Sequence, residues 1–311
     1  MNWLAHFEKK FLDPRELDLE DRAYWVPCFD DPRPLRKSIE AAGILNPPVV
    51  QPRGNTLVPV LGRRRLQAAL ELGLGQVEVK LISKDMPEAD GFLFAFWDNV
   101  GHRSWDSAAR AVVVRRLLEL LPRETVAQEM LGVLGVPPRG PVLERLQKIG
   151  RLEYPALPML AAGLLQEKTA VVLAEMATEE RLRLLNVIER LGMNANKNAE
   201  MVSDLFDLSV FHNSPISELL AEEAFASLLA DRYTARPELA RRFRELVRSR
   251  KYPDAVKRGE EFSRWSRNLH PTDNVSVRAT PGFENEDCTI EIRARSRYEA
   301  EEIIRRLRKE P

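Results

Sequence analysis

The chain has 311 residues, of which 47 are basic and 47 acidic, and 44% of the residues are hydrophobic. This composition is typical of a globular protein and excludes a disordered or fibrous chain. The longest apolar stretch, residues 155–165, is far shorter than the roughly 20 residues that cross a bilayer, so we expect no membrane partner. Residues 1–10 lack the apolar core of a secretory signal. Cys28 and Cys288 alone are too few for a four-ligand zinc site or a disulfide framework. The sequence therefore predicts a cytoplasmic protein.

The neutral total hides two oppositely charged segments. Residues 201–231 contain six acidic residues and no lysine or arginine, whereas residues 232–267 contain twelve basic and five acidic residues. A nucleic-acid partner is therefore not excluded by the net charge, but we expect its contacts to be confined to a few surfaces.

Strand and helix patterns alternate over the first 103 residues. Two short apolar runs, 48–51 and 56–61, flank Pro52-Arg53-Gly54-Asn55, which is typical of a hairpin turn. Helices are predicted at 34–42, ending at Gly43, and at 63–72, ending at Gly73, and a further strand at 77–82.

From residue 104 the apolar periodicity becomes helical. The predicted helices are 105–121, 123–131, 141–149, 155–165, 178–191 and 215–230, the last with Ser214 as its cap. A basic helix at 237–250, strands at 275–278 and 289–293 and a charged helix at 297–309 follow. The fold class is therefore multidomain α+β, with an α/β domain (1–103), an all-α domain (104–230) and a basic helix with a small ββα unit (231–311).

One segment contains the residues that most strongly indicate a binding site. It is a predicted strand, 58–61, followed directly by Gly62 and by a helix that starts with Arg63-Arg64-Arg65. Free backbone N–H groups and the positive end of the helix meet there. Glycine permits close approach of a ligand, and guanidinium groups bind phosphate oxygens bidentately. The pattern predicts a site for nucleotide or nucleic-acid phosphate. The alternative is a solvated, arginine-rich helix start.

The order of several short motifs resembles the amino-terminal domain of the ParB family of partition proteins. The resemblance covers roughly residues 15–190 and is carried by the order and spacing of its motifs. The motifs are Leu35…Ser38-Ile39, Gly43-x-x-x-Pro47, Gly62-Arg63-Arg64-Arg65…Ala68-Ala69, Gly73 and Asp98-Asn99-Val100-Gly101-His102.

The resemblance implies a ParB/sulfiredoxin-like fold, a CTP pocket, a bound Mg²⁺ and a DNA-binding clamp. In the family, the glycine-arginine turn holds the triphosphate, the Gly-x-x-x-Pro segment lies near the base, and the third box binds the metal and supports slow hydrolysis. The positions that match are Gly62, Arg63, Arg64 and Arg65 for the turn, Gly43 and Pro47 for the base, and Asp98, Asn99 and His102 for the third box, with Asp98 catalytic and Asp98 and Asn99 as metal ligands.

The sequence departs from the family pattern at the pocket. Arg63 stands where the family has glutamate, Asp98 replaces the third-box glutamate, and Gly101 and His102 replace glutamine and arginine. The Asp98 carboxylate is shorter than that of glutamate and would hold an activating group in a different position. We therefore expect nucleotide binding to be retained more fully than hydrolysis, and any CTPase activity to be weak. The alternative for Asp98 is a cap on the following helix.

Two segments are candidates for DNA binding. A helix-turn-helix is predicted from the helix at 125–131, a stretched turn at 132–138 and a second helix that presents Arg139, Arg145 and Lys148; the alternative is a structural helical hairpin. The basic segment could bind phosphates without sequence preference or could pair with the preceding acidic segment. Its candidate contacts are Arg241, Arg242, Arg244 and Arg248.

The resemblance therefore implies a nucleoid-associated, CTP-regulated protein that binds DNA as a homodimer and acts in chromosome, plasmid or phage partition, with a partition ATPase as a further partner. The terminal ββα unit has too few strands to be stable alone, which also favours pairing with a second copy.

One alternative is an enzyme on the same scaffold, a nuclease or phosphotransferase, although clustered carboxylates for nuclease metals are lacking. Sulfiredoxin chemistry needs a cysteine in the turn, whereas the turn holds Arg63-Arg64-Arg65 and Cys28 stands about 35 positions earlier in the sequence. The other alternative is an adaptor that binds no nucleotide.

Overall fold

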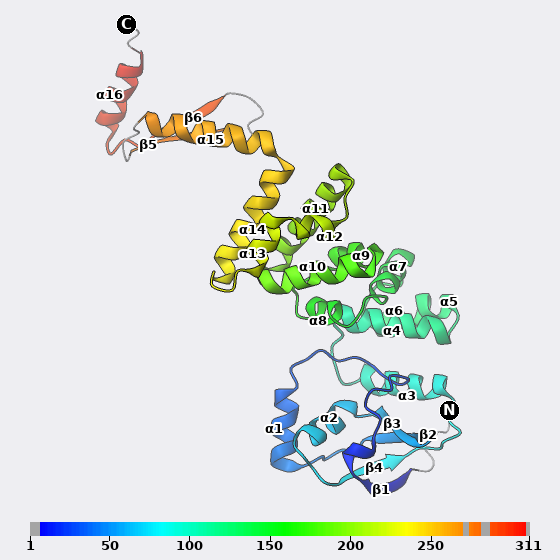
Figure 1. Ribbon diagram of the computed structural model, residues 1–311. Helices are drawn as coiled ribbons and strands as arrows, with labels where there is room; N and C mark the ends of the chain where they lie inside the picture. The colour runs from blue at the N-terminus through cyan, green and yellow to red at the C-terminus, as the bar shows by residue number, and fades with distance from the viewer. Residues whose placement is uncertain (1–6, 270–273, 281–286, 309–311) are drawn as a thin grey trace. The chain divides into compact units, whose positions relative to one another are not determined.

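The computed structural model describes residues 7–269, 274–280 and 287–308. The chain forms two compact units (Figure 1). The first comprises Met1–Glu189 with Met193–Ala199, and the second comprises Arg190–Gly192 with Glu200–Pro311. The mixture of strands and helices confirms the predicted multidomain α+β class.

A four-stranded sheet organises the start of the first unit. Its strands are β1 (Glu8–Leu12), β2 (Val49–Arg53), β3 (Thr56–Leu61) and β4 (Val77–Leu81), in the order β1-β4-β2-β3. The hairpin β2–β3 is antiparallel, as predicted, and β4 runs parallel to β2 and antiparallel to β1.

Helices cover both faces of this sheet. They are η1 (Pro14–Glu16), α1 (Arg33–Ala42), α2 (Arg63–Glu71) and α3 (Glu88–Val100). Leu66 of α2 packs on Val50 and Val79, which are fully buried. Successive strand residues point to opposite faces, so the neighbouring Gln51 points away from α2. Its side-chain nitrogen donates to the Met86 carbonyl, just before α3, at 2.9 Å.

The rest of the first unit is helical. Its elements are α4 (Ser107–Leu120), α5 (Arg123–Thr125), the π-turn η2 (Val126–Met130), α6 (Leu131–Val133), α7 (Gly140–Ile149), α8 (Ala156–Ala161), α9 (Glu167–Glu175) and α10 (Thr178–Leu191). Helix α7 packs on α4. The approach is close, because a Cβ on Gly150 would lie 2.5 Å from the Ala111 carbonyl oxygen.

The second unit combines a helical core with a terminal sheet. Its elements are α11 (Ala195–His212), α12 (Ile216–Ala221), α13 (Glu223–Ala230), α14 (Arg236–Lys251), α15 (Pro253–Asn268), β5 (Val275–Ala279), β6 (Cys288–Ile292) and α16 (Arg297–Arg308). Phe225 and Phe243 form the centre of the core, with ring centroids 5.4 Å apart. No helix in the described part of the chain combines the length and apolarity that a membrane span needs.

Several predicted element bounds were wrong. The predicted helix 215–230 is two helices, because Glu222 has an extended backbone (ψ 141°) and is the amino-terminal cap residue of α13. Ser214 does not cap the first of them: Pro215 is the cap residue, and the Ser214 hydroxyl donates to Glu218 instead. Helix α8 is shorter than predicted, and the sequence patterns missed β1, α3, α9, α11 and α15. Residue 309 of the predicted last helix lies outside the described residues.

Replacing Gly91 by alanine should destabilise the first unit. A Cβ there would lie 2.5 Å from the Tyr24 ring and 2.7 Å from the Met86 methyl carbon, both buried. Overpacking of this kind costs about 1–3 kcal/mol of unfolding free energy. Urea unfolding of Gly91→Ala should show this loss. The control is Gly132→Ala in α6, where a Cβ meets nothing within 4 Å. Equal stability of Gly91→Ala and the wild type would contradict the packing described.

Candidate functional site

A cavity of about 520 Å³ lies at the amino end of α2, where β3 ends. Its walls come from the loop 19–30, the start of α2, the last turn of α3 and the segment after α3. Seven of the predicted site residues line it: Gly62, Arg63, Arg64, Arg65, Asp98, Asn99 and His102. The residues described as lining it do not include Gly43 or Pro47, so the structure does not bring these two to the same cavity.

Gly62 makes the sharp turn from strand to helix. It has φ 80° and ψ 23°, a left-handed conformation that side chains disfavour. A Cβ there would also lie 3.0 Å from the Arg65 guanidinium. The Gly62 carbonyl accepts from the amides of Arg65 and Leu66, which starts α2. The first N–H groups of the helix therefore point toward the cavity mouth, where an anion is favoured.

The three arginines after Gly62 bind backbone carbonyls of the surrounding loops. The Arg63 guanidinium donates to the carbonyls of Leu19 and Asp21. The Arg64 guanidinium donates to Cys28 Sγ at 2.9 Å and to two further carbonyls, those of Asp30 (3.2 Å) and Asp31 (3.1 Å). The Arg65 guanidinium donates to the Asn46 carbonyl, which is the one link from the cavity to the Gly43–Pro47 segment that these bonds supply.

Burial affects two of these cations. It lowers the pKa of the Arg63 guanidinium below its ordinary value, and it lowers the pKa of Arg65 likewise, although the Asp98 carboxylate opposes the shift at Arg65. Arginine starts from so high a pKa that both remain charged at neutral pH. The cavity therefore holds concentrated positive charge in a partly desolvated place, which suits a phosphate chain.

The third predicted motif also lines the cavity. Asp98 and Asn99 belong to the last turn of α3, so Asp98 does not cap the following helix; Asp106 does, accepting from the Ala109 amide at 2.9 Å. The Asn99 side-chain nitrogen donates to the Ala95 carbonyl at 2.7 Å, so its oxygen is the atom available for a cation. The described residues contain no group of three His, Cys, Asp or Glu side chains that could hold a metal by themselves.

Sequence reasoning missed an aromatic and basic part of the cavity. Arg22 lies 4.9 Å from the ring centroid of Trp25 and 5.7 Å from that of Tyr154. Arg103, beside the third motif, also lines the cavity. Trp25 and Tyr154 are about 130 residues apart in sequence and carry no motif, so no local pattern could have brought them together.

The predicted helix-turn-helix contains a short first helix and a well-formed second one. Helix α7 buries Val142, Leu143, Leu146 and Ile149 and exposes the predicted contacts. Two of these are in ion pairs: Arg145 with Glu167 at 2.7 Å and Lys148 with Glu175 at 2.5 Å. Arg139 is exposed at the amino end of α7, the end that a recognition helix presents to a groove.

The basic helix α14 is extensively ion-paired, but three of the candidate contacts pair with acidic residues outside the segment 201–231 that the alternative interpretation named. Arg241 and Arg242 bind Glu238 on the same helix and together lower the pKa of Glu238 to about 2, with Arg241 the larger cause. Arg244 pairs with Glu200 at 3.2 Å. Arg248 instead lines a groove between α14 and α15. These pairs are exposed and therefore individually weak, so they leave binding of nucleic-acid phosphate open.

The terminal elements bury very little. None of the described side chains in α15, β5 and β6 is buried, and Ile290 and Ile304 expose 56% and 49% of their surface. A two-stranded sheet is marginal in water unless its apolar face is covered.

Two curated proteins of Thermus thermophilus are similar in sequence. The first, a "Probable plasmid-partitioning protein ParB", is 26% identical over 231 residues, which cover 72% of this chain and 71% of the relative. The second, the "Chromosome-partitioning protein Spo0J", is 29% identical over 164 residues, which cover 52% of this chain and 58% of the relative, so the chain spans less than two thirds of the latter.

Solved structures similar to the chain also carry the ParB name. The C-terminally truncated ParB of Caulobacter crescentus complexed with CTP-gamma-S is 19% identical, with a TM-score of 0.27, over 58% of this chain and 98% of that one. A Pnob8-like ParB-N domain is 16% identical, with a TM-score of 0.36, over 79% of this chain and 98% of that one. No family model matches the sequence. The two curated relatives and the chain's own ordered motifs support a divergent ParB-family member.

Proposed function

We propose that the protein is a partition protein that binds CTP in the cavity at α2 and DNA through its helical part. The names of the two curated relatives support the partition role. The observation that carries the nucleotide assignment is the cavity itself. A left-handed glycine, a helix amino end and three arginines, of which Arg63 and Arg65 are partly desolvated, meet on one wall of it. This arrangement favours a ligand with several phosphate charges over a small neutral molecule.

Asp98 and Asn99 suit a magnesium ion bound with the nucleotide. Mg²⁺ usually takes one or two protein oxygens and completes its shell with phosphate oxygens and water. Asp98 and Asn99 supply a carboxylate and an amide oxygen at one end of α3. They would hold the ion only when phosphates supply the remaining ligands. The ion would offset the phosphate charge, and Asp98 is the residue we assign to slow hydrolysis.

Nucleotide binding should depend on Arg64 and Arg65. Arg64→Ala and Arg65→Ala should each weaken CTP binding at least tenfold, because a hydrogen bond to a charged group contributes about 1.5–3 kcal/mol. Titration with labelled CTP and ATP, with and without Mg²⁺, measures this. The control is Arg183→Ala, an exposed arginine of α10 paired with Glu179. If neither nucleotide binds the wild type, the pocket is degenerate and the adaptor alternative holds. If Arg64→Ala binds CTP normally, the assignment of the phosphates to Arg64 is wrong.

The DNA proposal rests on the exposed face of α7. Its buried face packs against α4 and α9, so the polar residues on its exposed face are held rigidly. Arg139, Arg145 and Lys148 would contact bases or phosphates there, and Arg241, Arg242, Arg244 and Arg248 of α14 would add contacts that are independent of sequence and sensitive to salt.

DNA selection should be lost in Arg139→Ala. Capture of fragmented host DNA by the wild type should enrich at least one site, and Arg139→Ala should reduce that enrichment by about tenfold, the effect of one lost base contact. The matched control is Glu175→Gln, which removes the ion-pair partner of Lys148 without removing a cation. Enrichment should persist in the control. A wild type that enriches no site would limit the protein to non-specific binding or to none.

We also propose that the protein is a homodimer, that the terminal elements form the dimer contact, and that a partition ATPase is a further partner on the nucleoid. The support for the dimer is the apolar surface that α15, β5, β6 and α16 leave uncovered.

The dimer should dissociate when charge is placed on this surface. Ile290→Asp and Ile304→Asp should shift the sedimentation of the full chain from dimer to monomer, because a buried, unpaired carboxylate costs several kcal/mol. Phe211→Asp is the matched control, since Phe211 of α11 is 82% exposed and lies outside these elements. A wild type that sediments as a monomer at micromolar concentration would contradict the proposal.

A further inference from the structure

The loop 18–24 forms one wall of the cavity. It is anchored at its start, where the Asp18 amide donates to the Leu57 carbonyl of β3 at 2.9 Å. Leu19, Arg22 and Tyr24 line the cavity. The loop also makes two turns of its own. The Asp18 carboxylate accepts from the amides of Glu20 and Asp21 at 3.0 Å, and the Asp21 carboxylate accepts from the Ala23 amide at 2.8 Å. These bonds shape the loop but do not place it against the cavity. Contacts from outside the loop must do that.

On the cavity side, Arg63 holds the loop. Both of its terminal nitrogens donate to loop carbonyls, those of Leu19 and Asp21. Because both terminal nitrogens are bound to the loop, the guanidinium points toward the loop and away from the place of a phosphate. Arg63 therefore shapes the cavity by holding its wall, the loop 18–24, in position.

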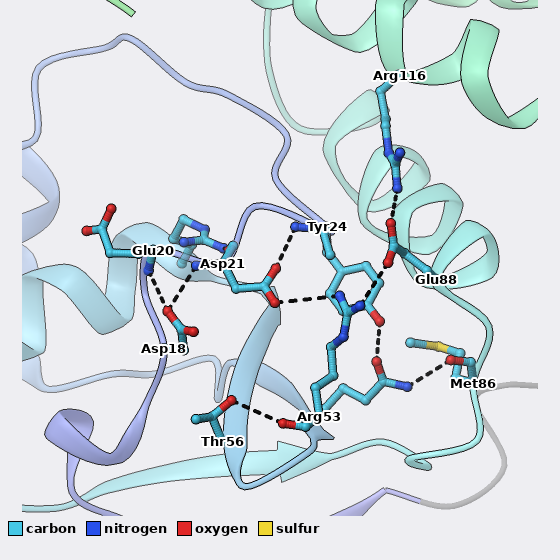
Figure 2. Close-up of polar contacts among 12 residues, drawn as sticks. Asp18, Glu20, Asp21, Tyr24, Arg53, Thr56, Met86, Glu88 and Arg116 are labelled. Carbon is cyan, nitrogen blue, oxygen red and sulfur yellow. Dashed lines mark hydrogen bonds and ion pairs between the residues drawn. The ribbon is translucent and has the colours of Figure 1, made fainter.

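On the opposite side of the loop, a chain of charged side chains continues the connection (Figure 2). The Asp21 carboxylate pairs with Arg53 of β2 at 3.6 Å, and Arg53 pairs with Glu88 at 2.9 Å. Glu88, in the first turn of α3, also binds Arg116 of α4. All four side chains are partly buried, with exposed fractions between 25% and 41%. Partial burial weakens screening by water and salt, so this network is worth more than a surface pair.

Tyr24 fixes the end of the loop beneath Arg53. Its ring centroid lies 5.7 Å from the Arg53 guanidinium carbon, and its hydroxyl donates to the Gln51 side-chain oxygen. Tyr24 and Gln51 are 3% and 1% exposed. Arg53 thus contacts the loop at two points, a carboxylate and a ring.

We propose that Arg53 and Arg63 are positioning residues for the nucleotide pocket, which hold the loop 18–24 from opposite sides and so set the position of Arg22. This rests on the proposed CTP binding. It separates the arginines of the motif by role: Arg64 and Arg65 bind the phosphates, and Arg63 holds the wall. It also assigns a part in nucleotide binding to Arg53, which does not line the cavity among the described residues.

The test combines nucleotide affinity with hydrogen exchange of the loop amides in the nucleotide-free protein. Arg53→Gln should raise the CTP dissociation constant at least tenfold and should speed exchange at the amides of Glu20, Asp21 and Ala23. Arg53→Lys keeps the charge and should lie between Arg53→Gln and the wild type. Arg64→Ala should weaken CTP binding without speeding exchange in 18–24, because Arg64 binds residues 28–31 instead. Arg183→Gln is the control that should change neither quantity.

Unchanged exchange in Arg53→Gln overturns the proposal, whatever happens to affinity, and so does faster exchange with normal CTP affinity. If the wild type binds neither CTP nor ATP, the nucleotide function fails, and the role of Arg53 in nucleotide binding fails with it. The exchange data then still decide whether Arg53 holds the loop. If Arg53→Gln does not fold, as judged by its melting temperature, Glu88→Gln replaces it, because it removes one partner of Arg53 and leaves Asp21 in place.

Discussion

The candidate site depends on one constraint: the loops around the amino end of α2 carry backbone carbonyls that neither helix nor sheet satisfies. An arginine offers five N–H groups in a fixed plane, so it can bind several such carbonyls at once. The carbonyls of Leu19 and Asp21 are bound in partly buried contacts, and those of Asp30, Asp31 and Asn46 in exposed ones. Arg63, Arg64 and Arg65 provide these donors to three separate loop segments, around residues 19–21, 28–31 and 46. The same three residues that suggest a phosphate site therefore also hold its walls together.

These two roles compete at Arg64 and Arg65. A phosphate oxygen accepts the same guanidinium donors as a carbonyl, and its full charge makes the stronger bond. Phosphates entering the cavity would draw these two guanidinium groups from the carbonyls of Asp30, Asp31 and Asn46. Arg63 is bonded to the loop at both terminal nitrogens, so the wall at 18–24 would stay in place while the walls at 28–31 and 46 change partners.

The sequence predicted the parts of this site that depend on local order. Gly62 and the arginines form a strand-turn-helix pattern within eight residues, and the structure places them as expected. The contributions of Arg53, Glu88 and Tyr154 depend on contacts between segments 28 to more than 100 residues apart, which no periodicity encodes. Helix α11 was missed because polar residues interrupt its apolar periodicity. One of them, Asn198, is fully buried, and its side-chain nitrogen donates to the carbonyls of Leu164 and Met193.

The neutral net charge of the chain is reflected in ion pairs within the second unit. The acidic segment 201–231 and the basic helix α14 neutralise each other in pairs, with Lys251 bound to both Asp204 and Asp207 at 2.6 Å and Arg250 bound to Glu222 at 2.7 Å. Lys251 is largely shielded from solvent, which makes these contacts hard to exchange for a phosphate, whereas the pairs of Arg241 and Arg242 are exposed and exchange easily. Nucleic acid would therefore meet α14 on the face of Arg241 and Arg242, and the acidic residues opposite Lys251 would stabilise the unit instead of opposing the binding.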